Sequence, residues 1–498
     1  MKLTKIALAV ATLLASTQAF AVPVTAAQIT AAQNAGTLQQ AWISGASAPT
    51  KSVYEGWVGS GAGVGCDVGT NTIFTNQALT NTNVTPGSLD NFTAYACTRA
   101  GVVSVLYHTL DGGSLHAYTP HTVGTKLARL KFVGTGNGCT GSLNYVDATN
   151  TDNNATVFKG CTLVGGPLPA TGIATASGNT TNAAAVAADP LAPQLPVGGF
   201  SDVESSLFPS VIGGGDVSAV GIDSPVGIGQ VFGVVVSRPL YRAMQVAQSI
   251  AANTDALDPT FDPANAPSIS KAQYTSIISA GGAYQANWSP IVGAAGAAKK
   301  VVLARRVQTS GSQASSNAFF LSNPCANGAL ANLNPATAIN TANFEVFEGS
   351  GTGNVKTRIT TATNSAGNDN FAIGVISAEN DWRTETATGG RNGYRFIKVD
   401  GVHPEAGDIA NARVTATNAS YPFHIEAHSF LANTATGFGA SVINEITAAL
   451  TNPPATSCAV LPRGLTISPL VGSSCTVGVQ VAKGTNLGNN CSPAQLTQ

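Results

Sequence analysis

The sequence has 498 residues, of which only 10% are charged, and its formal net charge at pH 7 is −1. That length provides material for two or three domains and a sizeable core. Nucleic acids and anionic membranes attract a surplus of basic residues, so the charge balance argues against both as partners. A composition this poor in lysine is more typical of abundant extracellular or cell-surface proteins.

The first segment has the pattern of a secretory signal peptide. The basic start Met1–Lys5 precedes an apolar run and the small residues Ala19 and Ala21, which predicts cleavage after Ala21. No cysteine follows this point, so we expect no lipid anchor there, and no later stretch is apolar for long enough to cross a bilayer. We therefore expect a protein of the periplasm or the cell surface.

All eight cysteines lie beyond the signal, and their spacing has no paired metal-binding pattern. We expect up to four disulfides, as is usual in oxidising compartments, with the connectivity left open. Two local pairs, Cys139 with Cys161 and Cys475 with Cys491, are working hypotheses.

The first part of the mature chain contains a helix-compatible segment and then a strand, a turn and a helix. Thr25–Gln40 is compatible with a helix, Ala41–Pro49 runs from a strand into a small-residue turn, and Thr50–Trp57 begins a helix. Hydroxyls and free N–H groups at such a turn can bind an anion. An ordinary Gly-Ser turn would produce the same pattern.

The region from about 59 to 198 is rich in Asn, Thr and Gly and contains four of the eight cysteines. Val102–His108 and Lys126–Val133 are its clearest strands. We interpret the region as a large loop-rich, disulfide-bearing insertion in the first half of the fold.

The remaining chain alternates strands and helices, which predicts an α/β fold. Gly229–Ser237 is a nearly unbroken apolar strand, and such a run is typical of a covered parallel sheet. The other predicted elements are a helix over Ser270–Ile278, strands over Phe371–Ser377, Tyr394–Val399 and Tyr421–Leu431, and a helix over Ala440–Leu450.

The stretch from Val301 to Leu321 has the pattern of a strand, a Ser-Gly-Ser turn and a helix. The start of such a helix offers unpaired N–H groups and the positive end of its dipole, and Ser310 and Ser312 add hydroxyls. Arg306, four residues before Ser310, can supply a planar fork of donors to a tetrahedral oxyanion. The alternative is a serine-capped helix beside a surface arginine.

With these segments in order, the chain resembles the periplasmic phosphate-binding proteins of ABC phosphate importers, which have the type II periplasmic binding protein fold. The matching segments are Ile43–Ala48, Gly199–Asp202, Gly229–Ser237, Lys271–Trp288, Arg306–Ser312, Phe371–Ser377 and Tyr421–Leu431. The resemblance implies two lobes: residues 22–237 with 421–450, and residues 238–420. It also implies hinges near Val236–Arg238 and Tyr421–Phe423. A cysteine-containing extension, 451–498, lies beyond the family's usual end.

The resemblance further implies a ligand-binding set for phosphate or a related oxyanion. Its arginine falls on Arg306, and its buried aspartate, which accepts a proton from hydrogen phosphate, falls on Asp202. The full implied set is Ser47, Ala48, Thr50, Ser142, Asp202, Arg306, Ser310, Gly311 and Ser312. Asp202 is also suited to cap a following helix.

Three departures from the family pattern bear on anion binding. Pro49 has no N–H to donate, the register that selects Ser142 is blurred by the insertion, and Glu204 adds negative charge where the family usually has proline. The fold is therefore expected to be kept, with anion binding weakened or altered.

Three functions are compared. The first is oxyanion binding, with ABC transporter membrane components as partners; the second is a structural role, such as a surface-layer component that self-assembles. The third, a phosphatase, has the least support, although His424, Glu426 and His428 alternate along one strand and would share a face. We expect no enzymatic activity, cofactor or metal.

Overall fold

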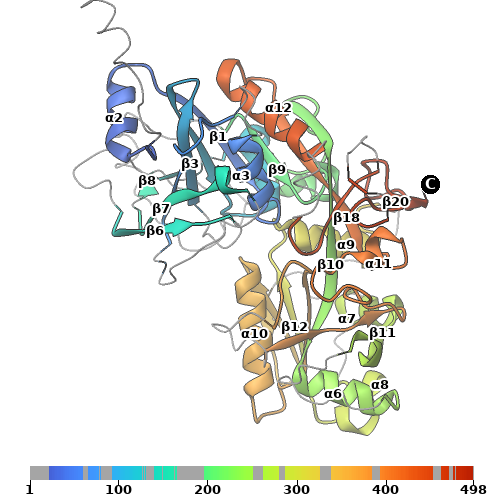
Figure 1. Cartoon of the computed structure of the whole chain (residues 1–498). Helices are drawn as coiled ribbons and strands as arrows, with labels where there is room; N and C mark the ends of the chain where they lie inside the picture. Colours follow the sequence, from blue (N-terminus) through green and yellow to red (C-terminus); the bar gives the residue numbers. More distant parts are fainter. Residues whose placement is uncertain are drawn as a thin grey trace, which may run out of the picture.

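The computed structural model describes residues 22–59, 65–77, 79, 92–125, 127, 129–130, 139–147, 150–161, 163–164, 196–250, 262–279, 287–325, 338–383, 393–451, 461–469, 475–476 and 478–496. Within these ranges the chain is a mixed α/β structure built on one large sheet (Figure 1). The strands of this sheet are β1 (Gln39–Gly45), β2 (Thr72–Thr75), β3 (Phe92–Arg99), β4 (Val102–Thr109), β6 (Gly141–Tyr145), β7 (Ala155–Lys159), β9 (Gly198–Ser201), β10 (Gly221–Ser237), β12 (Val301–Arg306), β13 (Ile339–Asn340), β14 (Phe344–Gly349), β15 (Ala372–Ser377), β16 (Tyr394–Phe396), β18 (His424–Ala432) and β19 (Leu465–Ile467).

Helices cover this sheet, and three two-stranded pairs lie outside it. The α-helices are α2 (Ala26–Asn34), α3 (Thr50–Val58), α4 (Thr119–Thr122), α6 (Arg238–Ala247), α7 (Lys271–Ile278), α8 (Ser289–Val292), α9 (Gly311–Leu321), α10 (Thr352–Asn364), α11 (Val414–Thr417) and α12 (Gly437–Thr451). The short pairs are β5 (Arg129–Leu130) with β8 (Leu163–Val164), β11 (Ser268–Ile269) with β17 (Lys398–Val399), and β20 (Gly484–Thr485) with β21 (Gln495–Leu496). Most helices and strands predicted between Thr25 and Leu450 correspond to these elements. The helix in Thr25–Gln40 ends at Asn34, the strand predicted at Gly229–Ser237 begins earlier, at Gly221, and most of the strand predicted at Lys126–Val133 lies outside the described residues.

The strand β10 joins two halves of the molecule. It pairs with β18 as far as Val231 and with β15 from Phe232 onward. Figure 1 shows β10 running between the part that carries α2, α3 and α12 and the part that carries α6, α8 and α10. We call the described residues of 22–231 and 424–451 the upper half, and those of 232–423 the lower half.

The order of strands explains why β10 is so apolar, and it also corrects one expectation. β10 lies in the middle of the sheet, with β18 and β9 on one side and β15 and β12 on the other, so the side chains of Val231–Val236 are buried on both faces. Its neighbours β15, β16, β18 and β19 are all antiparallel to it. The predicted parallel setting of this strand is therefore wrong, because burial on both faces is the cause of an apolar run whatever the strand direction.

Each half packs helices on both faces of its part of the sheet. In the upper half, α3 and α12 share a core with Ile43 and Leu106, while α2 packs through Ile29 on the other face. In the lower half, α10 packs on β12 and β15 through Val355 and Ile359. The opposite face carries α6, α7 and α9 in the largest core cluster.

The region expected to be an insertion belongs in large part to the sheet. β4 pairs in parallel with β1, on the side of β1 opposite to β9. The hairpin of β3 and β4 is buried along most of its length. The loop-rich character expected for the region is therefore wrong at Phe92–Thr109, where β4 confirms the strand predicted over Val102–His108. The alternating and apolar residues of β3 and β4 fill both faces of the upper sheet. Much of the remainder, including 165–195, lies outside the described residues.

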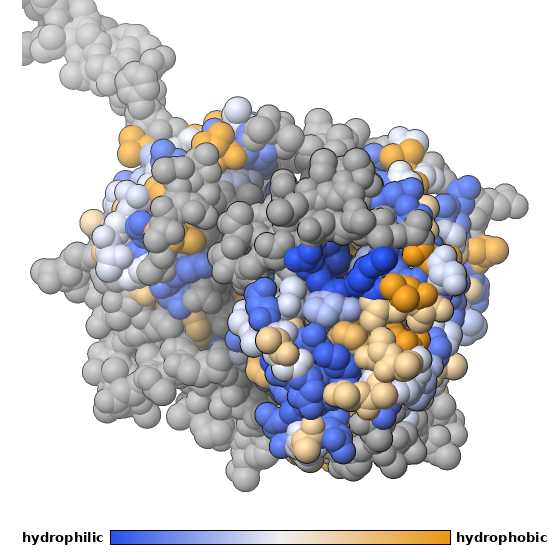
Figure 2. All heavy atoms as spheres, turned by 90° about the horizontal axis from the view of Figure 1, so that it is seen from below, coloured by the Kyte–Doolittle hydropathy of each residue, from blue (hydrophilic) through white to orange (hydrophobic). Residues whose placement is uncertain are grey.

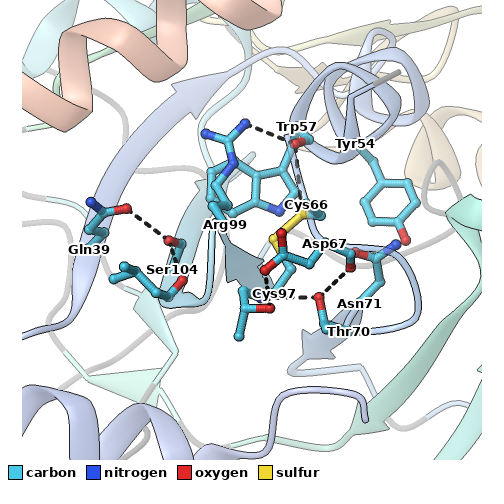
Figure 3. Close-up of a disulfide and its surroundings, with 12 residues drawn as sticks. Gln39, Tyr54, Trp57, Cys66, Asp67, Thr70, Asn71, Cys97, Arg99 and Ser104 are labelled. Carbon is cyan, nitrogen blue, oxygen red and sulfur yellow. Dashed lines mark hydrogen bonds between the residues drawn. A yellow bond between two sulfur atoms is a disulfide. The ribbon is translucent and has the colours of Figure 1, made fainter. Parts of the chain in front are cut away.

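The first disulfide fixes the end of β3, next to the turn into β4, to the segment after α3. Cys66 bonds Cys97, next to Asp67 (Figure 3). The Asp67 carboxylate accepts hydrogen bonds from the N–H groups of Ala100 and Gly101 at 3.2 and 2.9 Å. Ala100 and Gly101 both have positive φ, as the tight turn of this hairpin requires. The guanidinium of Arg99 lies 4.4 Å from the ring centre of Trp57.

Two further disulfides are described. Cys139 bonds Cys161, which confirms the first working hypothesis. Cys491 bonds Cys325 across 166 residues, so the pairing of Cys475 with Cys491 is wrong. The two cysteines closest in sequence do not pair, because the C-terminal segment folds back against the lower half and brings Cys491 to Cys325.

Two further features concern the surface of the lower half and the length of the helices. Seen from below, the described part of the lower half carries hydrophilic and apolar residues side by side (Figure 2). None of the helices in the described ranges has both the length and the apolar character that crossing a bilayer requires.

Candidate functional site

The lower half contributes Arg306 and the N-terminus of α9. Arg306 is the last residue of β12, and β12 is parallel to its neighbours β14 and β15, so the carboxyl ends of these strands meet at one edge. α9 starts just after this edge with Ser310 at its N-cap, and Ser310 and Ser312 are both buried. The predicted strand, turn and helix over Val301–Leu321 is confirmed.

The upper half contributes Asp202 and Ser114. Asp202 directly follows β9, and Ser114 begins a short helical turn (Ser114–Ala117) after β4. β9 and β4 are both parallel to β1, which lies between them, so Asp202 and Ser114 leave the sheet at the same edge. Both side chains are buried.

Ser114 connects the two halves at this point. Its hydroxyl donates to Asp202 Oδ2 at 2.9 Å and accepts the backbone N–H of Gly311 at 3.1 Å. Next to it, the N–H of Leu115 donates to the carbonyl oxygen of Thr309 at 3.0 Å. The first turn of α9 therefore lies directly against the Asp202 loop, and the residues that the resemblance implied from separate lobes are neighbours.

Arg306 lies between the N-termini of two helices. Its Nη1 donates to Thr352 Oγ1, at the start of α10, at 2.9 Å, and its Nη2 donates to the carbonyl oxygen of Ser350 at 2.7 Å. Thus the guanidinium is held in one orientation by the loop before α10. Its third nitrogen, Nε, is buried without a partner in the described part of the chain.

Burial controls the charges of this cluster. Desolvation raises the pKa of Asp202, and the hydrogen bond from Ser114 and the positive charge of Arg306 oppose that rise. Desolvation also lowers the pKa of Arg306 to about 10, although the negative charges of Asp202 and Glu379 act to raise it. Arg306 therefore stays cationic at neutral pH, beside two carboxyl groups.

Glu379 is the second of these carboxyl groups. It follows β15, and Ser377 Oγ donates to its Oε1 at 3.0 Å. Desolvation and the nearby charge of Asp202 raise its pKa to about 7, although Ser377, Lys356 and Arg306 act in the opposite direction. Near neutral pH, Glu379 is therefore divided between its neutral and charged forms.

Three polar side-chain atoms at this junction are buried without a hydrogen-bond partner among the described residues. They are Asp202 Oδ1, Arg306 Nε and Thr309 Oγ1. Buried polar atoms in folded proteins are normally paired, so such a group indicates a functional role or bound solvent. An acceptor, a cationic donor and a hydroxyl near a helix N-terminus can together hold a small, partly protonated oxyanion.

Four of the predicted site residues lie elsewhere or point away. Ser142 is exposed on β6, at the end of the sheet, separated from β9 by β1, β4, β3, β2 and β7. The structure does not bring Ser142 to the cluster, because among the described strands β6 pairs with β7 alone. Ser47 is exposed, Ala48 is half-buried, and Thr50 directs its hydroxyl to the carbonyl oxygen of Ser47 at 2.5 Å.

Two residues of the cluster were missed. Ser114 follows the glycine pair Gly112–Gly113, a few residues after the buried strand β4. Glu379 follows the strand Ala372–Ser377 in the same way. An acidic or hydroxyl residue just beyond a buried strand was the available signal in both cases.

The side chains of His424, Glu426 and His428 in β18 form hydrogen bonds within the fold. His424 shares a hydrogen bond with Thr466 at 2.7 Å, and the Glu426 carboxylate accepts hydrogen bonds from Ser468 and Thr485 at 2.8 and 2.6 Å. His428 contacts Asp223 at 3.0 Å. No group of three or more potential metal ligands is found in the described ranges.

Comparison with known proteins adds little to this geometry. No family model matches the chain, and no curated protein matches it. Among solved structures, the chain is similar to an ABC-type phosphate transport receptor from Vibrio cholerae, with 12% identity and a TM-score of 0.28 over 50% of this chain and 72% of that one. Likeness at this level leaves the function to be argued from the site itself.

Proposed function

We propose that this protein is an extracytoplasmic solute-binding protein of the type II periplasmic binding protein fold, and that it captures inorganic phosphate or a related tetrahedral oxyanion between its halves. Binding involves no covalent chemistry. The ligand would be passed to the membrane components of an ABC transporter. Three disulfides among the described residues support an oxidising location, either the periplasm or the cell surface.

One observation carries the proposal: Asp202 and Arg306, from opposite halves, meet at the N-terminus of α9 with buried, unpartnered polar atoms. Arg306 and the N-terminus of α9 supply positive potential for an anion. Asp202 supplies an acceptor. A carboxylate in this position favours an oxyanion that carries a proton, because a fully ionised one has no hydrogen to donate and is repelled.

The test is an equilibrium titration of the purified protein with phosphate, arsenate and sulfate at a fixed ionic strength. We expect phosphate and arsenate to bind and sulfate to be rejected. Asp202→Asn removes the repulsion and offers a donor, so sulfate should gain affinity relative to phosphate. No heat and no thermal shift at millimolar phosphate would contradict the proposal.

A matched pair of variants tests the arginine. Arg305 and Arg306 are consecutive in β12 and both buried, and Arg305 donates to Glu348 Oε1 at 2.8 and 3.1 Å. Neighbouring residues of a strand point to opposite faces. Arg306→Lys should therefore weaken phosphate binding by about ten-fold, since a planar fork is lost, while Arg305→Lys should leave it within about two-fold. Equal losses would indicate a general effect on stability.

A structural role is the second candidate. It is supported by the low charge of the chain and by the Ser114 hydroxyl, which already accepts the N–H of Gly311 that an anion would use. In this case the fold would be kept and the protein would assemble at the cell surface. Electron microscopy of the purified protein distinguishes the two: ordered sheets or polymers favour the structural role, and a monomer that binds phosphate opposes it.

A further inference from the structure

The C-terminal segment lies against both halves of the molecule. We call the described residues of 461–496 the strap. In Figure 1 the strap, with β20, lies beside the junction at the level of α9 and α11. Its β19 pairs with Ile228–Gln230 of β10, immediately before the point at Val231 where β10 changes its partner strand.

The first part of the strap is bound to the lower half. Arg413 donates to the carbonyl oxygen of Leu461 at 2.7 Å, and the N–H of Gly464 donates to Asn411 at 2.7 Å. Arg463 forms an ion pair with Glu405, a fully buried carboxylate that Arg383 also contacts at 2.7 Å. Buried ion pairs of this kind are costly to break, because each charge would be left uncompensated.

The next part of the strap is bound to the upper half. Leu465 joins the upper core, with Ile228 and Ala427. The buried Glu426 of β18 accepts hydrogen bonds from Ser468, from Thr485 and from the N–H of Gly488, at 2.8, 2.6 and 3.0 Å. The strap thus donates three hydrogen bonds to this one carboxylate of the upper half.

The end of the strap returns from the upper half to the lower half. The N–H of Asn490 donates to Glu204 Oε1 at 2.7 Å, two residues after Asp202. The next residue, Cys491, is bonded to Cys325, which lies just beyond α9. Consecutive residues therefore connect the loop that carries Asp202 to the end of the helix whose first turn faces Asp202.

We propose that the strap is a built-in clasp that holds the two halves closed against each other at the Asp202 and Gly311 junction. Hinge opening would have to move Glu204 away from α9, and Asn490 and Cys491 tie these two elements together. The strap contacts Glu204 and Cys325 beside the junction, and its β19 pairs with β10 where the two halves meet.

The clasp changes what the protein does with a ligand, and this step rests on the proposed function. A receptor that delivers its solute must open and close readily. A clasped protein exchanges its ligand slowly, so it retains the oxyanion instead of passing it on quickly.

The clasp can be tested without any ligand, by hydrogen exchange of the backbone amides of Leu115 and Gly311. Both N–H groups donate across the junction, so their exchange reports its opening. In the double variant Cys325→Ser, Cys491→Ser, we expect both amides to exchange about ten-fold faster or more than in the unaltered protein. The double variant Cys139→Ser, Cys161→Ser, which removes a disulfide within the upper half, is the control and should leave them unchanged.

Unchanged exchange of Leu115 and Gly311 in the Cys325 and Cys491 variant would overturn the clasp, as would equal acceleration in both double variants. If the double variant does not fold, Asn490→Ala keeps the disulfide and the backbone N–H but removes the hydrogen bonds from the Asn490 side chain to Glu204 and to the carbonyl oxygen of Glu426. Acceleration of the same two amides is expected. The release of radiolabelled phosphate should also be faster in these variants. If no form of the protein binds phosphate, the proposed function fails, and the amide exchange still decides the clasp.

Discussion

At the scale of single residues, the candidate site is defined by buried charged groups whose pKa values are shifted by desolvation. Asp202 and Arg306 come from different halves, and neither has all its polar atoms paired among the described residues. Glu379 adds a carboxyl group whose pKa desolvation raises to about 7. The net charge that faces an incoming anion therefore changes close to physiological pH.

The titration of Glu379 predicts a specific dependence of stability on pH. Its pKa in the folded protein, about 7, is above the ordinary value of 4.5, so the folded state binds more protons than the unfolded state between these values. Stability contributed by the neutral carboxyl is present at pH 4 to 5 and is lost as the pH rises toward 7. Glu379→Gln keeps a neutral group at all pH values.

We therefore expect Glu379→Gln to match the unaltered protein at pH 5 and to be more stable by about 1 kcal/mol or more at pH 8. Chemical denaturation without phosphate at the two pH values measures this difference. Asp381→Asn, two residues further along and paired with Arg383 at 2.9 Å, serves as a control that should be destabilising instead. A difference between Glu379→Gln and the unaltered protein that does not vary with pH would contradict the assignment.

At the scale of elements, the decisive feature is how closely α9 approaches the upper half. Gly311 is the first residue of α9, and a Cβ atom there would lie 2.4 Å from Ser114 Oγ and 2.5 Å from Asp202 Oδ2. The glycine is needed for this approach, and not for its backbone conformation. The sequence motif Ser-Gly-Ser therefore has a packing reason as well as a chemical one.

Gly311→Ala should separate α9 from Ser114 and Asp202, because the added methyl group has no room. We expect a loss of about 1–3 kcal/mol in the free energy of unfolding, together with weaker phosphate binding. Gly353 is the matched control: it also lies in the first turn of a helix, α10, and a Cβ there would meet no atom within 4 Å. Urea titration measures the free energy of unfolding of both variants, and Gly353→Ala should be neutral or stabilising. Equal effects at both positions would show that the contact at Gly311 has no special cost.

At the scale of the whole molecule, the two halves are not independent. The largest core cluster contains Leu115 and Phe430 of the upper half together with Phe320 and Phe423 of the lower half. The strap is bound to the upper half by hydrogen bonds such as that of Asn490 with Glu204, and to the lower half by an ion pair and a disulfide. A continuous core and a covalent tie couple the stability of the two halves.

We therefore expect urea to unfold the molecule in one cooperative transition. Trp57 reports on the upper half, and Trp288 and Trp382 report on the lower half, because each is buried in a different part of the core. Single-tryptophan variants that keep one of these residues should give the same midpoint by fluorescence and by circular dichroism. Two separated midpoints would mean that the halves unfold independently.

The sequence by itself determined the elements and much of the local chemistry. Apolar runs such as Val301–Leu303 and the capping residue Ser310 predict a strand and a helix start, because these depend on neighbouring residues alone. The alternation of strands and helices predicted the α/β class. The pairing of Cys139 with Cys161 was also within reach, since the two cysteines are separated by only 22 residues.

Only the tertiary structure decided which distant residues meet. Ser114 joins Asp202 and Gly311 across 88 and 197 residues, and Cys325 bonds Cys491 across 166. No local pattern encodes such contacts, because they depend on the order of strands in the sheet. Strand order and direction could not be read from local patterns, so two predictions were wrong: that β10 lies in a parallel setting, and that Ser142 belongs to the site. Burial and side-chain type can be read from a sequence, whereas strand order and direction emerge when the whole chain packs.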